Sequence, residues 1–157
     1  MTESKISVKR IFDERAIRKF MSDPQLFDAM MDDLPVKPDD LQPNTAADTV
    51  RWLGIYHNEK LVGMWYLSRL NHIMWQLHVA YAPDSWGTGI PKASIEQALD
   101  LAFKTTGAKK LYANIPTSYK QVVNFAKFGG MKIEGTCKRS WQKNGQIYDT
   151  YHMGVYR

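Results

Sequence analysis

Hydrophobic and polar residues follow two different periods along the chain, and together they predict an ordered series of strands and helices. Short alternating or apolar runs bounded by turn residues are typical of strands, whereas apolar residues three and four positions apart are typical of helices. On this basis, strands are predicted over residues 5–11, 50–56, 61–67, 73–81, 110–114, 131–141 and 146–155. Helices are predicted over residues 13–21, 24–31, 90–106 and 117–128.

Turn and capping residues support these boundaries. Ser22 or Asp23 is expected to cap the second helix, because both side chains can accept hydrogen bonds from first-turn amides. Gly107 is expected to end the long third helix. The last two strands are joined by Lys143-Asn144-Gly145, and Asn-Gly is the strongest short-range signal for a β-hairpin. The chain therefore reads as β-α-α-β-β-β-α-β-α-β-β.

The segment Pro83-Asp84-Ser85-Trp86-Gly87-Thr88-Gly89-Ile90 is the most informative one. It lies between a predicted strand and the start of a predicted helix. Its two glycines allow the backbone to bend tightly and to approach a ligand without Cβ atoms in the way. The free N–H groups of the first helical turn, together with the helix dipole, favour a negatively charged group there. The turn therefore predicts a phosphate-binding site.

Composition and charge narrow the class of protein. The 157 residues, with 44% hydrophobic and 24% charged residues, are typical of one globular domain over 1–157. No apolar run is long enough to span a bilayer, and the N-terminal sequence lacks the apolar core of a signal peptide. The single Cys137 suits a reducing cytoplasm. The formal net charge of +5 favours an anionic ligand or partner.

Two segments resemble the GNAT family of acyl-CoA N-acyltransferases. The glycine turn, in the frame Asp84-x-x-Gly87-x-Gly89, is similar to the family motif R/Q-x-x-G-x-G/A. The segment from Lys127 to Gly135 resembles the family segment K-x-G-F-x-x-x-G. The Trp-Gly-x-Gly motif is similar to sequences of the ribosomal-protein and spermidine acetyltransferase branch. The chain also has a fainter similarity to phage-encoded GNAT-like proteins.

The resemblance implies a fold and a cosubstrate. The expected fold is a single α/β domain, with a mixed, mostly antiparallel sheet of seven strands flanked by helices. This sheet is splayed between its fourth and fifth strands, where acetyl-CoA binds. The cofactor-binding residues expected from the resemblance are Tyr81, Trp86, Gly87, Thr88, Gly89, Ile90, Ser118 and Phe125. Backbone N–H groups from Trp86 to Ile90 are expected to hold the pyrophosphate.

The resemblance also suggests catalytic residues. A backbone N–H near Tyr81 is expected to bind the thioester oxygen, and His78 on the same strand is a candidate general base. Many family members place a tyrosine acid near the end of the last helix, but Phe125 occupies that position here. Ser118 and Tyr119 are therefore the candidate acids. Each of these residues also has a purely structural interpretation, as a strand, core or turn residue.

Two functions follow as expectations. The first is transfer of an acetyl group from acetyl-CoA to a primary amine of a small molecule or protein. The acceptor channel would be walled by residues 22–33, by residues 34–47 and by the final hairpin near Asp149. The alternative is a GNAT-like binding or assembly protein without catalysis, phage-encoded and virion-associated; Asp84, Phe125 and the Gly129-Gly130 pair favour it.

Other ligand classes are not expected. No recognition helix, RNA-binding strand signature or zinc-ligand spacing is present, so neither a nucleic-acid partner nor a metal is predicted. No membrane partner is predicted either. The oligomeric state is left open between a monomer and a homodimer.

Overall fold

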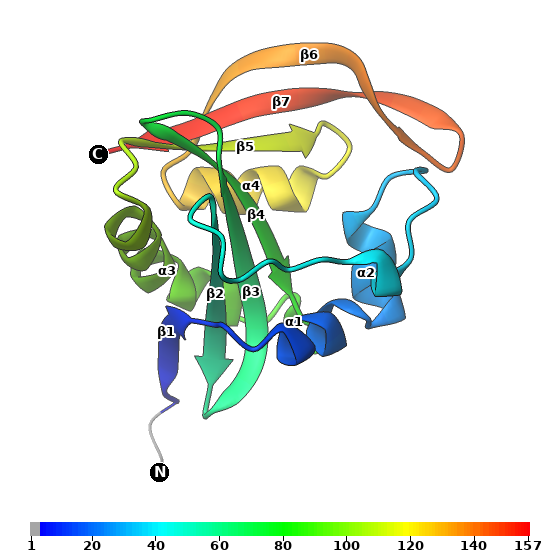
Figure 1. Cartoon of the computed structure of the whole chain (residues 1–157). Coiled ribbons are helices and arrows are strands. Elements are labelled where there is room, and N and C mark those ends of the chain that lie inside the picture. Colours follow the sequence, from blue (N-terminus) through cyan, green and yellow to red (C-terminus); the bar gives the residue numbers. More distant parts are fainter. Residues whose placement is uncertain (1–3) are drawn as a thin grey trace.

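The predicted strands assemble into one seven-stranded sheet in the computed structural model, which describes residues 4–157 (Figure 1). The predicted number and order of strands are confirmed. The strands are β1 (Ile6–Arg10), β2 (Val50–His57), β3 (Lys60–Arg69), β4 (Met74–Tyr81), β5 (Lys110–Pro116), β6 (Lys132–Lys143) and β7 (Gln146–Tyr156).

The strand order across the sheet is β1-β2-β3-β4-β5-β7-β6. Every neighbouring pair is antiparallel except β4 and β5, which are parallel. The parallel pairing extends over only three positions, Met74 with Lys110, Trp75 with Leu111 and Gln76 with Tyr112. Beyond Gln76 the two strands separate, so the sheet is splayed between its fourth and fifth strands as predicted.

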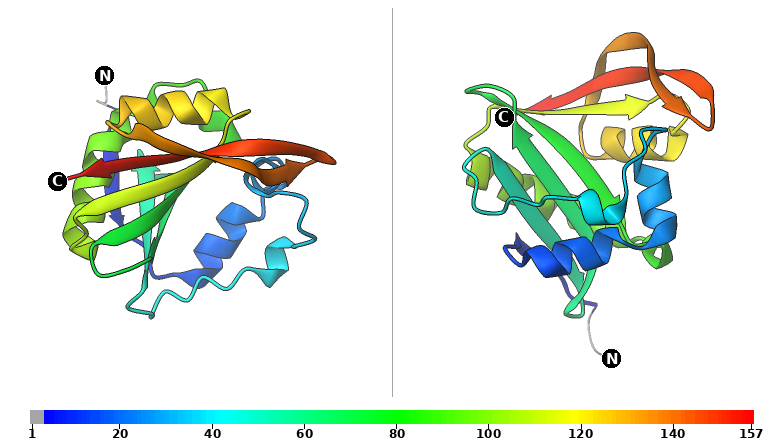
Figure 2. Two further views of the ribbon diagram at one scale, coloured as in Figure 1. Left: turned by 90° about the horizontal axis from the view of Figure 1, so that it is seen from above. Right: turned by 45° about the vertical axis from the view of Figure 1, so that its right-hand side comes forward.

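Four α-helices cover the two faces of this sheet (Figure 2). Helices α3 (Ile90–Thr106) and α4 (Lys120–Phe128) pack on one face, which is called the back face here. Helices α1 (Glu14–Met21) and α2 (Pro24–Met30) lie on the other, front face. Short 3₁₀ turns, η1 (Pro38–Asp40) and η2 (Pro83–Ser85), precede β2 and α3. In the described residues, no helix is both long and apolar enough to cross a membrane.

Alternation along the strands divides the core between these faces. On the back face, Trp65, Leu77 and Leu111 belong to the larger apolar cluster, together with residues of α3 and α4. On the front face, Trp52 and Met64 pack against α1 and α2 in a smaller cluster. Since successive strand residues point to opposite faces, the same alternation determines which polar side chains of each strand lie on the front face.

The capping predictions can be compared with the structure directly. Asp23 caps α2, because its carboxylate accepts hydrogen bonds from the amides of Gln25 and Leu26, both at 3.0 Å. Gly107 ends α3 in the left-handed conformation, with φ of 65°. Asn144 and Gly145 both have positive φ and form the predicted turn between β6 and β7.

The start of α4 is a correction to the sequence prediction. The helix begins at Lys120 rather than at Thr117. The Thr117 amide instead continues the β5–β7 ladder by donating to the Asp149 carbonyl, and the Tyr119 amide closes a turn onto Pro116. Within this helix Val123 and Ala126 are buried, whereas Val122 is exposed.

We predict that Gly63→Ala will destabilise the fold by about 1–3 kcal/mol through overpacking. A Cβ at Gly63 would lie 2.6 Å from Cδ1 of Tyr81 and 3.3 Å from Cβ of Ile55, both in the core. Urea unfolding followed by circular dichroism measures the effect. Gly135→Ala is the matched control, since a Cβ there meets no atom within 4 Å. Equal stability of the two variants would contradict the prediction.

Candidate functional site

The glycine turn lies at the C-terminal end of β4, between this strand and α3. Gly87 has φ of +71°, which only glycine adopts without strain, and Gly89 is the N-cap residue of α3. A Cβ built at either glycine meets no atom within 4 Å. The space above both residues is therefore free for a ligand to approach the backbone closely.

Three of the five predicted amide donors are already hydrogen-bonded inside the turn. The Trp86 amide donates to Pro83 and the Thr88 amide to Ser85, while the Ile90 amide donates to Oγ1 of Thr88. This leaves the amides of Gly87 and Gly89 without an acceptor in the described part of the chain.

The first turn of α3 adds one further donor to these two. The first bond to the N-cap carbonyl comes from Ala93, and Pro91 has no N–H. The amide of Lys92 is therefore free as well among residues 4–157. The amides of Gly87, Gly89 and Lys92 together are called the amide cradle here. It suits an anionic group such as a phosphate.

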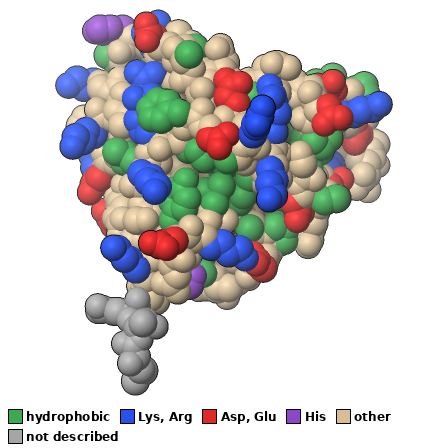
Figure 3. All heavy atoms as spheres, turned by 60° about the horizontal axis from the view of Figure 1, so that its bottom comes forward, with side chains coloured by type: hydrophobic (Ala, Val, Ile, Leu, Met, Phe, Trp, Pro, Cys, Tyr) green, Lys and Arg blue, Asp and Glu red, His purple; other side chains and the backbone are tan. Residues whose placement is uncertain are grey.

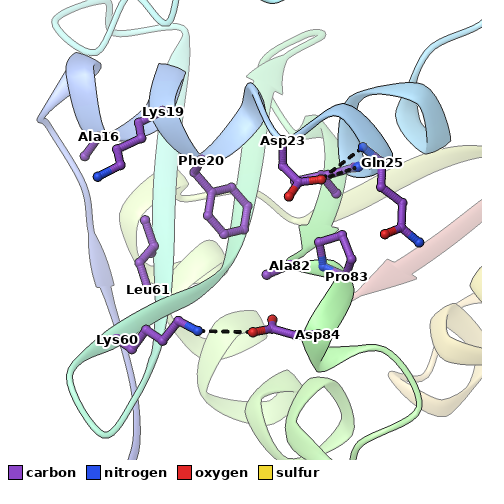
Figure 4. A pocket seen from close by; sticks show the side chains of 11 residues that line it. Ala16, Lys19, Phe20, Asp23, Gln25, Lys60, Leu61, Ala82, Pro83 and Asp84 are labelled. Atoms are coloured by element: carbon purple, nitrogen blue, oxygen red, sulfur yellow. Dashed lines mark hydrogen bonds and ion pairs between the residues drawn. The ribbon is translucent and has the colours of Figure 1, made fainter.

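The carboxylate of Asp84 does not oppose this cradle. It lies on the front side of the turn and forms an ion pair with Lys60 Nζ at 3.1 Å (Figure 4). Both residues border a pocket of about 870 Å³ between α1, the start of α2 and the end of β4.

On the lower face of the molecule, hydrophobic side chains are surrounded by charged ones of both signs (Figure 3).

The edge of β4 beyond the parallel pairing carries unpaired backbone groups. The Ala82 amide bonds to Val62 on β3, and the Lys110 amide bonds to the Ile73 carbonyl. Because backbone groups alternate in direction along a strand, the N–H and C=O groups of Val79 and Tyr81 point toward β5 and into the splay. No residue of β5 pairs with either of them within residues 4–157. The Trp86 indole N–H donates to the Tyr81 carbonyl at 2.8 Å, at the mouth of the splay.

The side chain of Tyr81 has a structural role. It is buried, its hydroxyl lies 2.7 Å from Oγ of Ser94, and it accepts a hydrogen bond from Nε1 of Trp65 at 3.3 Å. Burial raises the pKa of this phenol, which therefore stays neutral at physiological pH. The ring of Phe125 lies edge-on to the Tyr81 ring, with a centroid–centroid distance of 5.8 Å, so Phe125 lies on the back face of the sheet. Only the backbone of Tyr81 is available to a ligand.

His78 lies on the opposite face of β4 from Tyr81, and its side chain is exposed toward the acceptor side. Its ring stands 5.6 Å from the ring of Tyr66, which in turn stands 4.6 Å from that of Trp52. Although part of the side chain is exposed, desolvation of the rest lowers the pKa of His78 below its usual 6.5. The imidazole is therefore neutral at pH 7 and able to accept a proton.

The two candidate acids lie at the open end of the splay, beside β7. Ser118 is exposed, in the turn that precedes α4. Tyr119 is half-buried, and its ring lies edge-on to that of Trp141 with a centroid–centroid distance of 5.1 Å. The rings of Trp141 and Tyr148 have a centroid–centroid distance of 6.1 Å. Desolvation, reinforced by the nearby carboxylate of Asp28, raises the pKa of Tyr119. Its hydroxyl is therefore protonated at neutral pH and has a proton to donate.

Comparison with known proteins agrees with this geometry. The sequence model described as "Acetyltransferase (GNAT) family" matches residues 15–130, about three-quarters of the chain. The chain belongs to the acetyltransferase (GNAT) family. No curated protein matches it significantly. The family match covers both the glycine turn and α4, so the splayed sheet and the amide cradle are parts of a GNAT domain.

Solved structures share the fold across the whole chain. The spermidine N-acetyltransferase from Vibrio cholerae, in complex with CoA and spermine, aligns with a TM-score of 0.80 at 19% identity, covering 96% of this chain and 95% of that one. A GNAT-family acetyltransferase from Streptococcus pneumoniae gives 0.74 at 16% identity, covering 98% and 100%. The ribosomal-protein-alanine N-acetyltransferase from Brucella melitensis gives 0.77 at 17% identity, covering 96% and 99%. At these identities the likeness establishes the fold alone.

Sequence reasoning missed three features of the site. The free amide of Lys92 was not identified, although Pro91 at the second helical position marks it as the next donor. The unpaired amide of Val79 was missed because neither strand sequence indicates how far the β4–β5 pairing extends. The bond from the Trp86 indole to the Tyr81 carbonyl depends on how the turn folds back, and no local sequence signal predicts it.

Gly89→Val tests the amide cradle directly. The valine side chain would occupy the free space above the turn, so we expect acetyl-CoA affinity to fall by more than about tenfold, or about 1.4 kcal/mol. The fold should tolerate the change, since Gly89 has a negative φ and open surroundings. Isothermal titration calorimetry measures the affinity, and Gly135→Val serves as the control. Unchanged affinity in a folded Gly89→Val protein would place the phosphates elsewhere.

Proposed function

We propose that this protein transfers the acetyl group of acetyl-CoA to a primary amine of a small molecule. One observation carries the proposal: the amide cradle is continuous with the unpaired edge of β4 inside the splay. A ligand with a pyrophosphate at one end and amide groups along an extended arm matches both parts. The cradle binds the phosphates, and the N–H and C=O groups of Val79 and the N–H of Tyr81 bind the arm as a neighbouring strand would.

The direction of the arm assigns roles along β4. The cradle lies at the C-terminal end of the strand, so the arm runs back toward the paired end at Gln76. Because β-strand residues rise by about 3.3 Å each, the end of the arm falls closer to Val79 than to Tyr81. We therefore assign the thioester oxygen to the Val79 N–H, and the Tyr81 N–H to the arm. This refines the expectation of a donor near Tyr81.

Proton transfer is assigned to His78 on the front face and to residues at the start of α4. Acetyl-CoA supplies the acetyl group as an activated thioester. His78, neutral at pH 7, accepts the proton of the attacking amine, directly or through water. Tyr119, Ser118 or water donates a proton to the departing thiolate, since Phe125 has no proton to give. Tyr119 is favoured over Ser118, because its ring packs edge-on against the ring of Trp141 whereas Ser118 is exposed.

Charge segregation supports a cationic acceptor. Seven of the 16 acidic residues lie within residues 23–48, which contain a single lysine and no arginine: Asp23, Asp28, Asp32, Asp33, Asp39, Asp40 and Asp48. The rest of the chain is strongly basic, which suits the anionic CoA. Because α2 and the following loop border the front face, an amine meets a negative potential as it approaches. A polyamine such as spermidine is therefore the first acceptor to test.

Several finer expectations remain part of this proposal. The exposed Cys137 suits a reducing cytoplasm. The chain is expected to act as a monomer or a homodimer. The family match and the open cradle favour the enzyme over a phage-encoded, virion-associated assembly protein. Absence of a thermal shift with millimolar acetyl-CoA, together with no thiol release in the presence of spermidine, would favour the assembly role instead.

His78→Gln should lower kcat by roughly 10²-fold if His78 is the general base. The base must be neutral, and its pKa is lowered, so wild-type kcat/KM should fall only as the pH drops through a value below 6.5. In His78→Gln this acidic limb should vanish. Thiol release measured between pH 5 and 8 checks the profile. An unchanged acidic limb in the variant would remove His78 from the mechanism.

Phe125→Tyr restores a tyrosine at the position where many family members carry the general acid. The new hydroxyl would lie behind the splay near Tyr81, and we expect kcat to rise by several-fold if thiolate protonation limits turnover. Tyr119→Phe should have the opposite effect, whereas Ser118→Ala should have little. Single-turnover thiol release compares the three variants with the wild type. If no substitution changes the rate, solvent is the proton donor.

A further inference from the structure

The two halves of the splayed sheet meet again at the open end of the splay. Helix α2 and residues 31–33 belong to the half formed by β1–β4, and the β6–β7 turn belongs to the half formed by β5–β7. Both views in Figure 2 place the turn beside the C-terminal end of α2. The contacts between residues 28–33 and residues 142–145 are called the hairpin latch here. They connect segments more than 100 residues apart in the chain.

One part of the hairpin latch is Lys143. Its ammonium group donates to the main-chain carbonyls of Asp28 and Met31, the latter at 2.8 Å, and forms an ion pair with the Asp28 carboxylate at 3.1 Å. These carbonyls lie at the C-terminal end of α2, where helical carbonyls lack partners and the dipole favours a cation. The Lys143 side chain is only 15% exposed, so this lysine is committed to the contact.

The other part is Asp33, which binds the turn in return. Its carboxylate accepts hydrogen bonds from the amides of Asn144 at 2.7 Å and Gly145 at 2.9 Å, and from Nε2 of Gln142 at 3.1 Å. The Asp33 amide donates to the Gln142 carbonyl at 3.0 Å. The hydrogen bond from Gly145 is the largest cause that lowers the pKa of Asp33. Each segment therefore satisfies the free backbone groups of the other.

The outer part of the hairpin is set apart by an irregularity in β6. The register with β7 shifts between Cys137 and Trp141, and Arg139 has φ of 50°. Asp149 holds this irregularity by accepting the Arg139 amide at 2.9 Å and pairing with Lys138 at 3.2 Å. The carboxylate of Asp149, expected to wall the acceptor channel, is thus used within the hairpin. The segment beyond it turns toward α2.

Residues adjoining the hairpin latch include a candidate acid. Trp141 precedes Gln142, and its ring holds that of Tyr119. Asp28, on the α2 side, is close enough for its charge to raise the pKa of Tyr119. Opening the hairpin latch would therefore release both the α2 wall and the aromatic contact of Tyr119.

We propose that the hairpin latch positions the amine acceptor, with Lys143 and Asp33 acting as positioning residues that hold α2 and the β6–β7 turn together as one wall of the acceptor site. The proposal rests on the proposed function for its choice of acceptor. The amide cradle follows the C-terminal end of β4, and none of its residues makes any of these contacts. Opening the latch therefore weakens amine binding and leaves acetyl-CoA binding unchanged.

The test compares Lys143→Met and Asp33→Ala with the wild type. Calorimetry measures the affinity for spermidine with CoA bound, and separately the affinity for acetyl-CoA. Hydrogen exchange of the Asn144 and Gly145 amides reports whether the latch is open. We expect exchange to accelerate by about tenfold or more and spermidine affinity to fall by about fivefold or more, with acetyl-CoA affinity within about twofold. Arg157→Met, which removes an exposed ion pair with Asp100 outside the latch, is the control and should change none of these.

Two results would overturn the proposal. One is faster exchange at Asn144 and Gly145 with unchanged spermidine affinity. The other is an equal loss of affinity for both ligands, which would indicate general loosening of the fold. A wild type that binds no spermidine overturns it as well. A wild type that binds spermidine in a latch-dependent way but releases no thiol from acetyl-CoA would refute the proposed function and leave the positioning role standing.

Discussion

The short parallel pairing between β4 and β5 is the constraint on which the rest of the structure depends. Three residue pairs join the two halves of the sheet in the described chain, and then the strands separate. Backbone N–H and C=O groups that lose a strand partner must find another one or remain solvated. Both groups of Val79 and the N–H of Tyr81 stay available along an edge inside the domain, whereas the Tyr81 carbonyl accepts from the Trp86 indole. The sheet is left incomplete at a place where an extended ligand can complete it.

The same constraint places the amide cradle. Because β5 runs parallel to β4, the chain must return to the N-terminal end of β4 before β5 can start. Helix α3 makes this return. The N-terminus of α3 therefore lies at the C-terminal end of β4, next to the mouth of the splay. The amide cradle and the unpaired edge of β4 are thus consequences of one topological requirement, and Gly87 and Gly89 adapt the connecting turn to it.

Much of this could be predicted from the sequence, because it depends on local chemistry. Apolar periodicity located the strands and helices, Asp23 and Gly107 marked helix ends, and Asn144-Gly145 marked a hairpin. Features set by distant partners could not be predicted. The start of α4 is delayed because Thr117 pairs with Asp149, 32 positions away, and Lys143 meets α2 across most of the chain.

Charge is segregated along the chain in a way that suits the two proposed ligands, a cationic amine and the anionic acetyl-CoA. The acidic residues of 23–48 lie in and after α2, and the rest of the chain carries a net positive charge. At physiological ionic strength such fields act over about 8 Å, so each guides only the ligand that is already near its own entrance. Asp84 could have broken this separation, since it lies within three residues of Gly87. Its ion pair with Lys60 keeps the carboxylate on the front side, turned away from the amide cradle.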